Sequence, residues 1–162
     1  MDPITHTCSG ILIGQGLRPQ AAVRRRTLLV AGLAGFAPDF DSVSYLWGSD
    51  AFYRFHHTYT HTLVGIVILA VILAGLERRW LRELSFARLL GLNLAGCTIH
   101  LCGDLIALWP LRILWPFSDH DFVLKWTNDF DYVVLAAVVV ATGLSETDGF
   151  QKYAPWIIAG AL

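Results

Sequence analysis

Long apolar segments separated by short polar ones dominate the chain. Their pattern predicts helices over residues 4–17, 27–37, 59–76, 89–109 and 131–144, and a further apolar segment covers residues 154–162. Asp2 and Pro3 suit the N-cap and first position of the first helix, and Pro38 ends the second. Residues 38–58 show no clear period and are predicted to form a loop. The segment 89–109 has the length of about 20 residues that a bilayer crossing needs.

The composition favours one membrane-embedded domain over residues 1–162. Hydrophobic residues make up 55% of the chain and charged ones 15%, against about a quarter charged in soluble domains. We therefore expect an all-α integral membrane bundle of four to six hydrophobic helices. The net charge of −1 gives no basic face for a nucleic acid. No basic region precedes the first apolar segment, so the first helix is expected to be kept rather than cleaved as a signal. We expect the cysteines, Cys8, Cys97 and Cys102, to be buried free thiols.

The basic residues predict how the chain lies in the membrane. If successive helices alternate in direction, one side collects nine of the twelve basic residues, namely Arg18, Arg24, Arg25, Arg26, Arg78, Arg79, Arg82, Arg88 and Lys152. The positive-inside rule makes that side cytoplasmic. The sequence thus predicts a multi-pass protein of the cell membrane.

Histidines and aspartates gather on the opposite, non-cytoplasmic side of this arrangement. His100 and Asp104 stand four residues apart, hence on one face of a helix. Ionisable groups in membrane segments are expensive and usually functional. We therefore expect a metal site at one membrane surface, with ligands drawn from His6, Asp39, Asp41, His56, His57, His61, His100 and Asp104.

Imidazole and carboxylate ligands suit Zn²⁺, Mn²⁺ or Fe²⁺, and we expect one or two divalent ions, with Zn²⁺ first. Helical spacing favours His57 beside His61, although a helix that begins at Tyr59 would allow His56 instead. Asp41 is expected to be a ligand or a general base. His57 or Arg54 would then contact an anionic substrate.

Each of these residues also has a purely structural interpretation. His6 can be a hydrogen-bonded core residue, His100 and Asp104 can be a polar pair between helices, and the two aspartates near Pro38 can form a turn. The remaining polar and aromatic candidates are expected to be a solvated loop at Asp119, His120 and Asp121, and interfacial anchors at Trp109, Trp115 and Trp126.

The order of the motifs resembles the YdjM-like family of membrane-bound, predicted metal-dependent hydrolases, which includes LexA-regulated inner-membrane proteins. The resemblance rests on Thr5-His6, Pro38-Asp39-Phe40-Asp41, His56-His57-Thr58-Tyr59-Thr60-His61-Thr62, His100-Leu101-Cys102-Gly103-Asp104 and Leu114-Trp115-Pro116-Phe117-Ser118. It implies a metal-dependent hydrolase of the membrane.

The chain departs from the family pattern at defined positions. The family's central motif, His-Arg-Gly-x-Thr-His-Ser, aligns with His56, with His57 in place of Arg and Thr58 in place of Gly. The resemblance therefore prefers His56 as the ligand, whereas helical spacing prefers His57. The family's Thr-Pro-x-Gly is replaced by residues 107–110.

A looser similarity, in the series His, Asp, His and then His-x-x-x-Asp, is to the helical fold of zinc-dependent phospholipase C and P1-type nucleases. It implies a phosphoester substrate. The function expected from the sequence is cleavage of a lipid phosphoester by metal-activated water. The alternatives are hydrolysis of a lipid amide or ester, or a metal-binding membrane protein or transporter without enzymatic activity.

Overall fold

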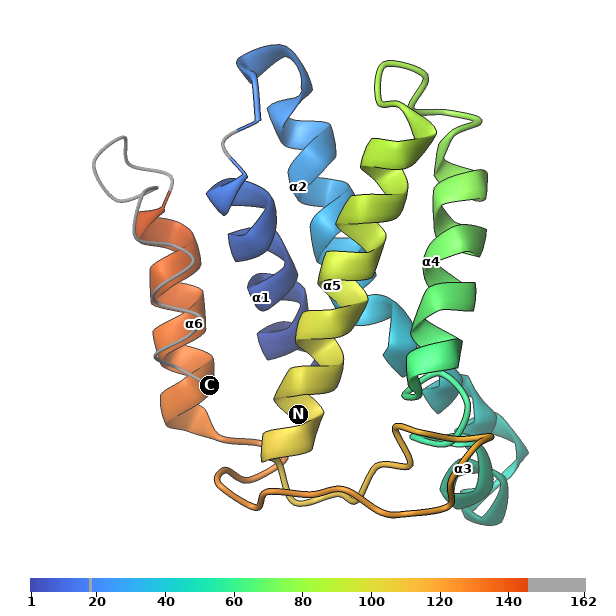
Figure 1. Ribbon diagram of the computed structural model, residues 1–162. Coiled ribbons are helices and arrows are strands. Elements are labelled where there is room, and N and C mark those ends of the chain that lie inside the picture. The colour runs from blue at the N-terminus through green and yellow to red at the C-terminus, as the bar shows by residue number, and fades with distance from the viewer. Residues whose placement is uncertain (18, 146–162) are drawn as a thin grey trace.

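The computed structural model describes residues 1–17 and 19–145 and consists of helices and connections. Five longer helices lie side by side (Figure 1): α1 (Pro3–Gly16), α2 (Ala21–Phe36), α4 (Leu63–Glu77), α5 (Phe86–Ile106) and α6 (Tyr132–Leu144). A 3-10 helix, η1 (Ala37–Trp47), and a short helix, α3 (Ser49–Phe55), lie together at one end of this row. Within the described residues β pairing is limited to one isolated bridge between Leu111 and Phe122. The predicted all-helical class is therefore confirmed.

Several predicted boundaries were wrong. The segment 38–58 is not a loop but holds η1 and α3, because Pro38 stops α2 yet suits the first turn of a new helix. The second helix begins at Ala21 rather than Thr27, so the arginines before Thr27 are helical. The helix expected from Tyr59 starts only at Leu63. The apolar segment 154–162 lies outside the described residues.

Small residues let α1, α2 and α5 approach closely. A Cβ atom on Gly10 would stand 2.2 Å from the carbonyl oxygen of Ala31, and one on Gly35 would stand 2.4 Å from that of His6. On α5, a Cβ atom on Gly96 would meet the Ala34 side chain at 2.5 Å. Close backbone contact of this kind is typical of helices that associate in membranes. It brings α1 and α5 within reach of the same stretch of α2.

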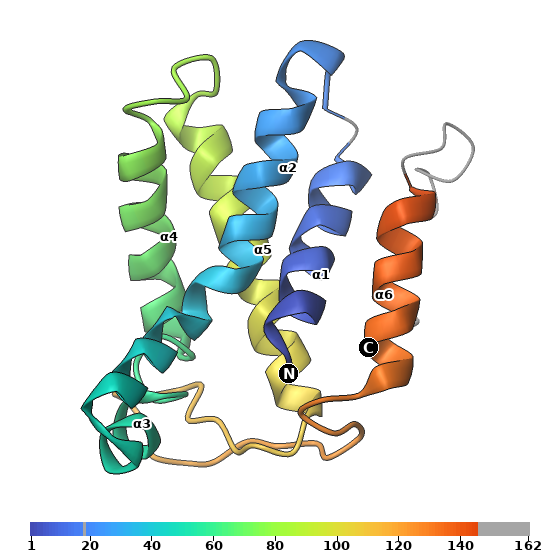
Figure 2. The ribbon, with the colours of Figure 1, turned by 180° about the vertical axis from the view of Figure 1, so that it is seen from behind.

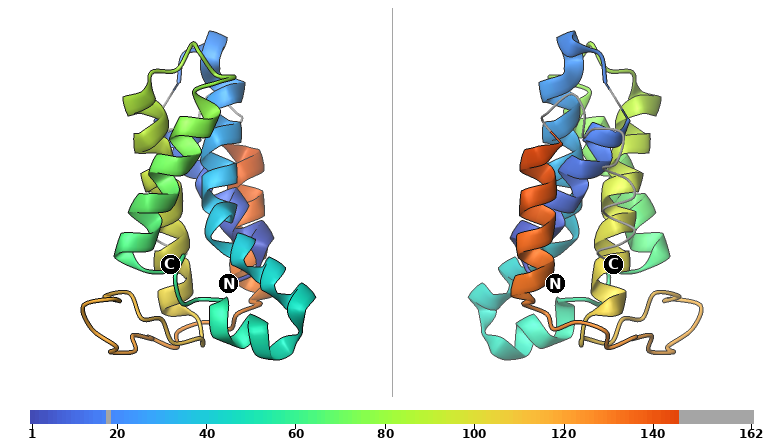
Figure 3. Two further views of the ribbon diagram at one scale, coloured as in Figure 1. Left: turned by 90° about the vertical axis from the view of Figure 1, so that its right-hand side faces the viewer. Right: turned by 90° about the vertical axis from the view of Figure 1, so that its left-hand side faces the viewer.

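The helices alternate in direction, so their connections gather at two opposite ends of the molecule (Figures 1 and 2). These two ends differ in the residues that they carry. One end carries the first turns of α2 and the α4–α5 connection, which contain most of the described arginines, and Arg26 pairs there with Glu83 at 2.5 Å. The other end carries η1, α3 and the start of α1 and α4 (Figure 3). The predicted separation is confirmed for these arginines, while Arg18 and Lys152 lie outside the described residues.

α5 is long and apolar enough to cross a membrane by length and composition, and α4 and α6 are shorter apolar helices. The connection from α5 to α6 folds over the end that bears η1 and α3 (Figure 3). It is held there by backbone hydrogen bonds, in which Leu63 donates to Ile113 at 2.9 Å and Leu124 donates to Leu105 at 2.8 Å. As expected, residues 119–121 of this connection are exposed.

Candidate metal centre

The predicted histidines and aspartates meet at the end of the bundle that bears η1. They come from the first turn of α1, from η1, from the 56–62 segment and from the last turns of α5. His61, His100 and Asp104 are completely buried, and His6 and Asp39 nearly so. Their nitrogen and oxygen atoms form groups whose members lie within 4.8 Å of one another and can hold a metal ion. The residues of these groups are His6, Asp39, Asp41, His56, His57, His61, His100 and Asp104.

Four of these residues face a common centre. The Nε2 atoms of His61 and His100 lie 3.0 Å apart. Oδ1 of Asp39 lies 3.6 Å from the first and 3.5 Å from the second. Oδ2 of Asp104 lies 3.3 Å from His61 Nε2 and 3.0 Å from His100 Nε2. Two imidazole nitrogens and two carboxylate oxygens are thus directed at one point.

The far nitrogens of the same two rings have acceptors of their own. His100 Nδ1 donates to the carbonyl oxygen of Gly35 at 2.6 Å. His61 Nδ1 lies 2.9 Å from the Thr60 hydroxyl and 3.3 Å from Asp41 Oδ2. A proton on Nδ1 leaves the lone pair of Nε2 free, which is the arrangement of histidines that bind metal ions. The donor set therefore fits a divalent cation.

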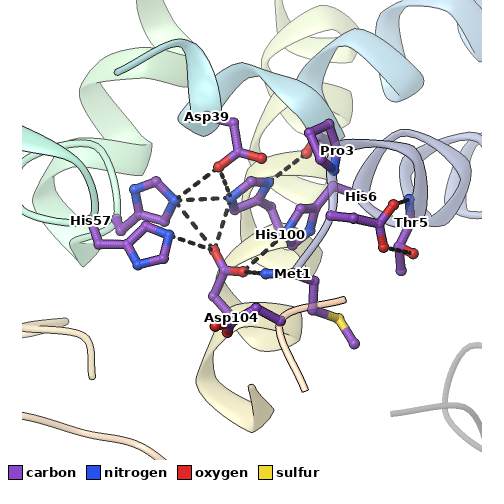
Figure 4. Close-up of polar contacts among 12 residues, drawn as sticks. Met1, Pro3, Thr5, His6, Asp39, His57, His100 and Asp104 are labelled. Atoms are coloured by element: carbon purple, nitrogen blue, oxygen red, sulfur yellow. Dashed lines mark hydrogen bonds and ion pairs between the residues drawn. The ribbon is translucent and has the colours of Figure 1, made fainter. Parts of the chain in front are cut away.

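His6 adds a second group on the other side of Asp104 (Figure 4). Its ring stacks on that of His100, with the centroids 3.6 Å apart, and its Nε2 lies 3.0 Å from Asp104 Oδ1. The α-amino group of Met1 contacts the same oxygen. Asp104 therefore presents one oxygen to His6 and the other to His61 and His100. With Asp39 shared between the groups, the cluster has enough ligands for two cations.

His57 lies beside the four residues that face the common centre, and its backbone is strained. Its φ of 64° lies in the left-handed region, which is uncommon for any residue but glycine and often marks functional sites. Its Nε2 lies 3.9 Å from Asp104 Oδ2, and its buried Nδ1 has no hydrogen-bond partner within the described residues. Burial and the neighbouring His61 lower the pKa of His57 to about 2, so this ring is neutral and able to act as a ligand.

Asp41 accepts hydrogen bonds from the surrounding segment. His56 Nδ1 lies 2.6 Å from Oδ1, and Oδ2 accepts from the Thr60 hydroxyl at 2.6 Å and from the backbone N–H of His57 at 3.2 Å. Burial opposes ionisation, but the hydrogen bonds from His56 and His61 hold the pKa of Asp41 well below its usual range. Asp41 is thus an ionised carboxylate that fixes the 56–61 turn.

Negative charge dominates the centre. Burial would lower the pKa of His61, but Asp104, Asp39 and Asp41 together raise it to about 10. A ring that takes up a proton so readily is compensating for carboxylates that face it. A divalent cation would supply the same compensation with more charge.

The helical explanation for pairing His57 with His61 was wrong, although the two rings are adjacent, with centroids 4.4 Å apart. Both residues precede α4, and a turn rather than a helix brings them together. His100 and Asp104 do lie on one face of α5, as their spacing predicted. The carbonyl of Gly35 and the hydroxyl of Thr60 were not foreseen. No sequence signal marks the carbonyl, whereas Thr60 could have been suspected from its place beside His61.

A polar cavity of about 470 Å³ lies against the cluster. His56 and His57 form its boundary with the metal ligands, and Trp109 packs edge-on against His57 at 5.6 Å between centroids. The rest of its wall includes Tyr53, Arg54, Tyr59, Arg112 and Trp115. Two tryptophans expected to be plain interfacial anchors, Trp109 and Trp115, thus also line this cavity.

Comparison with known proteins shows the family to which the chain belongs. The chain is 26% identical over 153 residues to the uncharacterized protein YfhP of Bacillus subtilis (strain 168), which covers 89% of this chain and 46% of that protein. The chain thus spans about half the length of this relative. No solved structure matches, and the looser similarity to the phospholipase C fold is not supported by these comparisons. A sequence model of the family described as YdjM inner membrane protein matches residues 1–162, and the chain belongs to that family.

Proposed function

We propose that the protein is a membrane-bound, metal-dependent hydrolase whose substrate is a lipid phosphoester. The observation that carries this proposal is the position of the polar cavity directly beside the cluster, with His57 on the boundary between them. Structural zinc sites are closed by four protein ligands, whereas catalytic sites keep access for water and substrate. A cavity of 300 to 1,000 Å³ is typical of small-molecule sites, and this one falls in that range at about 470 Å³.

The contacts favour different roles for the eight residues of the cluster. We assign the inner positions, which face the common centre or Asp104, to His6, Asp39, His57, His61, His100 and Asp104. Asp41 takes a positioning role, because its oxygens already accept hydrogen bonds from the turn. His56, bonded to Asp41, stands with it outside the inner set. The assignment differs from the sequence-based expectation, which placed Asp41 and His56 among the ligands.

One or two divalent cations, Zn²⁺ in first place, would act in this site as Lewis acids that lower the pKa of bound water to about 7. The chain's own residues would orient the ligands, exclude water and form the wall of the substrate cavity. Gly35 and Asp41 hold the rings of His100 and His61 in the orientation that exposes Nε2. Burial of the inner residues excludes bulk water on the side of the bundle. The neutral ring of His57 forms part of the cavity wall that the substrate would meet.

We further infer that the longer helices cross the membrane, with α5 as the central span, and that the arginine-rich end is cytoplasmic. The metal cluster then opens on the non-cytoplasmic side. A lipid would reach it sideways, with its head group at the level of η1 and α3. This placement agrees with the exposed aromatic residues of that end, among them Tyr45, Trp47, Phe117 and Trp126.

The direct test is hydrolysis by the purified protein in detergent, loaded with Zn²⁺ or Mn²⁺ and given phospholipids, acyl-amide lipids and acyl-ester lipids in parallel. We expect the phospholipids to yield diacylglycerol or phosphatidic acid, the lipid products of phosphoester cleavage, rather than a lysophospholipid and a fatty acid, and we expect loss of that product in His100→Ala. The matched control is His120→Ala, because His120 is exposed and outside the cluster. If only the amide or ester lipids gave a product, the protein would be an acyl hydrolase rather than a phosphoesterase. No product from any lipid, with cations bound, would overturn the hydrolase.

A further inference from the structure

A second, apolar groove adjoins the polar cavity. It has a volume of about 360 Å³ and follows α4, where its wall includes Val64, Gly65, Ile68, Leu69 and Ile72. Tyr59 and Trp115 belong to both the groove and the cavity, and their rings meet edge to face with centroids 5.1 Å apart. A polar compartment and an apolar one therefore share a wall of two aromatic rings.

The polar compartment carries groups that suit an anion. Two arginines, Arg54 and Arg112, and one aspartate, Asp121, line this cavity, and Asp121 pairs with Arg112 at 3.3 Å. In the part of the chain that the structure describes, no acidic side chain pairs with Arg54. His57 also lines this cavity, and its side chain is only 8% exposed. Arginine is well suited to phosphate, which it can bind through two parallel hydrogen bonds.

The apolar compartment has the chemistry and direction to hold part of an acyl chain. It begins at the cavity and runs along α4 away from the metal cluster, and from Val64 to Ile72 the helix rises about 12 Å. In the proposed membrane placement, the aromatic residues exposed around η1 and the α5–α6 connection put the cavity at head-group depth. The groove then lies at the depth of the hydrocarbon.

From this juxtaposition we propose that the cavity and the groove together form one binding site for an anionic phospholipid, with the phosphate between Arg54 and Arg112 and one acyl chain along Ile68 and Ile72. The site rests on the proposed function in two respects, that the phosphate faces the metal ligands and that the bundle lies in the membrane as proposed. Binding itself needs no turnover. It can therefore be measured separately from hydrolysis.

The test uses the full chain in neutral detergent and follows quenching of tryptophan fluorescence by lipids with brominated acyl chains. Phosphatidic acid is the probe, diacylglycerol with the same chains lacks the phosphate, and inorganic phosphate lacks the chains. We expect saturable quenching by phosphatidic acid, at least about tenfold weaker binding of diacylglycerol, and little competition by inorganic phosphate.

Variants separate the two compartments. We expect Arg54→Gln and Arg112→Gln each to weaken the binding of phosphatidic acid about tenfold and to leave the binding of diacylglycerol unchanged. Ile68→Phe fills the groove, so we expect it to weaken the binding of both lipids. The matched control is Val67→Phe, on an exposed position of α4 that does not line the groove. Should an arginine variant fail to fold, as judged by thermal unfolding, Arg54→Lys keeps the charge and removes the paired hydrogen bonds.

The outcomes distinguish the site from the enzyme. Equal binding of phosphatidic acid and diacylglycerol, or no effect of Ile68→Phe, overturns the two-part lipid site. Inorganic phosphate that binds as tightly as the lipid assigns the cavity to a free phosphate compound instead. Lipid binding without hydrolysis overturns the proposed function alone, while phospholipid hydrolysis and binding that Ile68→Phe and the arginine variants leave unchanged overturn the two-part site alone.

Discussion

The Nε2 atoms of His61 and His100 lie 3.0 Å apart, although the residues are separated by 39 positions in the chain. Both rings have an acceptor at Nδ1, so two lone pairs are directed at one another. Such an approach is favourable only with a positive charge between the nitrogens, either a proton or a metal ion. The carboxylates of Asp39 and Asp104 at the same point favour the ion.

Replacing an inner carboxylate should empty the site. Asp104→Asn removes the charge that faces His6 on one side and His61 on the other, and we expect the affinity for Zn²⁺ to fall by at least about 100-fold. Metal content after dialysis, measured by elemental mass spectrometry, reports the loss. The exposed Asp121→Asn is the control for cation content. Unchanged metal content in Asp104→Asn would contradict the assignment.

Replacing the positioning carboxylate should have a milder effect. Asp41→Asn weakens the hold on the His61 ring without removing an inner ligand, so we expect cation affinity to fall about 10- to 100-fold. Titration with a competing chelator measures this affinity. Asp50→Asn, in the exposed first turn of α3, should leave it unchanged. A loss as complete as in Asp104→Asn would instead make Asp41 a direct ligand.

Cation removal should lower the melting temperature. A ligand that binds only the folded protein at 100 times its dissociation constant adds about 2.7 kcal/mol to the free energy of unfolding. We therefore expect excess chelator to lower the unfolding temperature, as followed by circular dichroism, and Zn²⁺ to restore it. His100→Ala should show no such response to chelator. An unchanged temperature in the metal-loaded wild-type protein would speak against a resident cation.

A methyl group on α2 should disturb both the packing and the site. In Gly35→Ala the added Cβ stands 2.4 Å from the carbonyl oxygen of His6, so α1 and α2 must separate. We expect a loss of about 1 to 3 kcal/mol in the free energy of unfolding, with weaker cation binding because the Gly35 carbonyl orients His100. Gly91→Ala on α5 meets nothing within 4 Å and should be neutral or stabilising by up to about 1 kcal/mol. Equal stability of the two variants would show that the close approach is not required.

The helical class and the meeting of His61, His100 and Asp104 could be predicted from the sequence, because they follow from the apolar pattern, the spacing on α5 and the alternation of the helices. The spacing of His100 and Asp104 survives in the structure since α5 is a regular helix on which four residues make about one turn. The separation of the arginines from the site likewise follows from the alternation of helices.

What could not be predicted depends on contacts between distant segments. His57 reaches the cluster through a left-handed turn held by Asp41, and no periodicity reveals such a turn. The start of α4 at Leu63 depends on the Thr62 cap, which accepts from the Gly65 backbone at 2.8 Å, and on Gly65, where a Cβ would stand 1.9 Å from the Tyr59 carbonyl. The pairing of Gly35 with His100 exists only once α2 and α5 have packed together.

The inner residues are drawn from α1, η1, the 56–61 turn and the last turns of α5, so the newly made chain has no complete binding site until residue 104 has been synthesised and inserted. Four of the six inner residues, His6, Asp39, His57 and His61, precede α5, so the set stays incomplete until α5 has joined the bundle. On the proposed function, loading follows assembly of the bundle, and the ion comes from the compartment that the end bearing η1 and α3 faces. In the proposed membrane placement this is the non-cytoplasmic compartment, whose supply of metal would then limit how much of the protein is loaded.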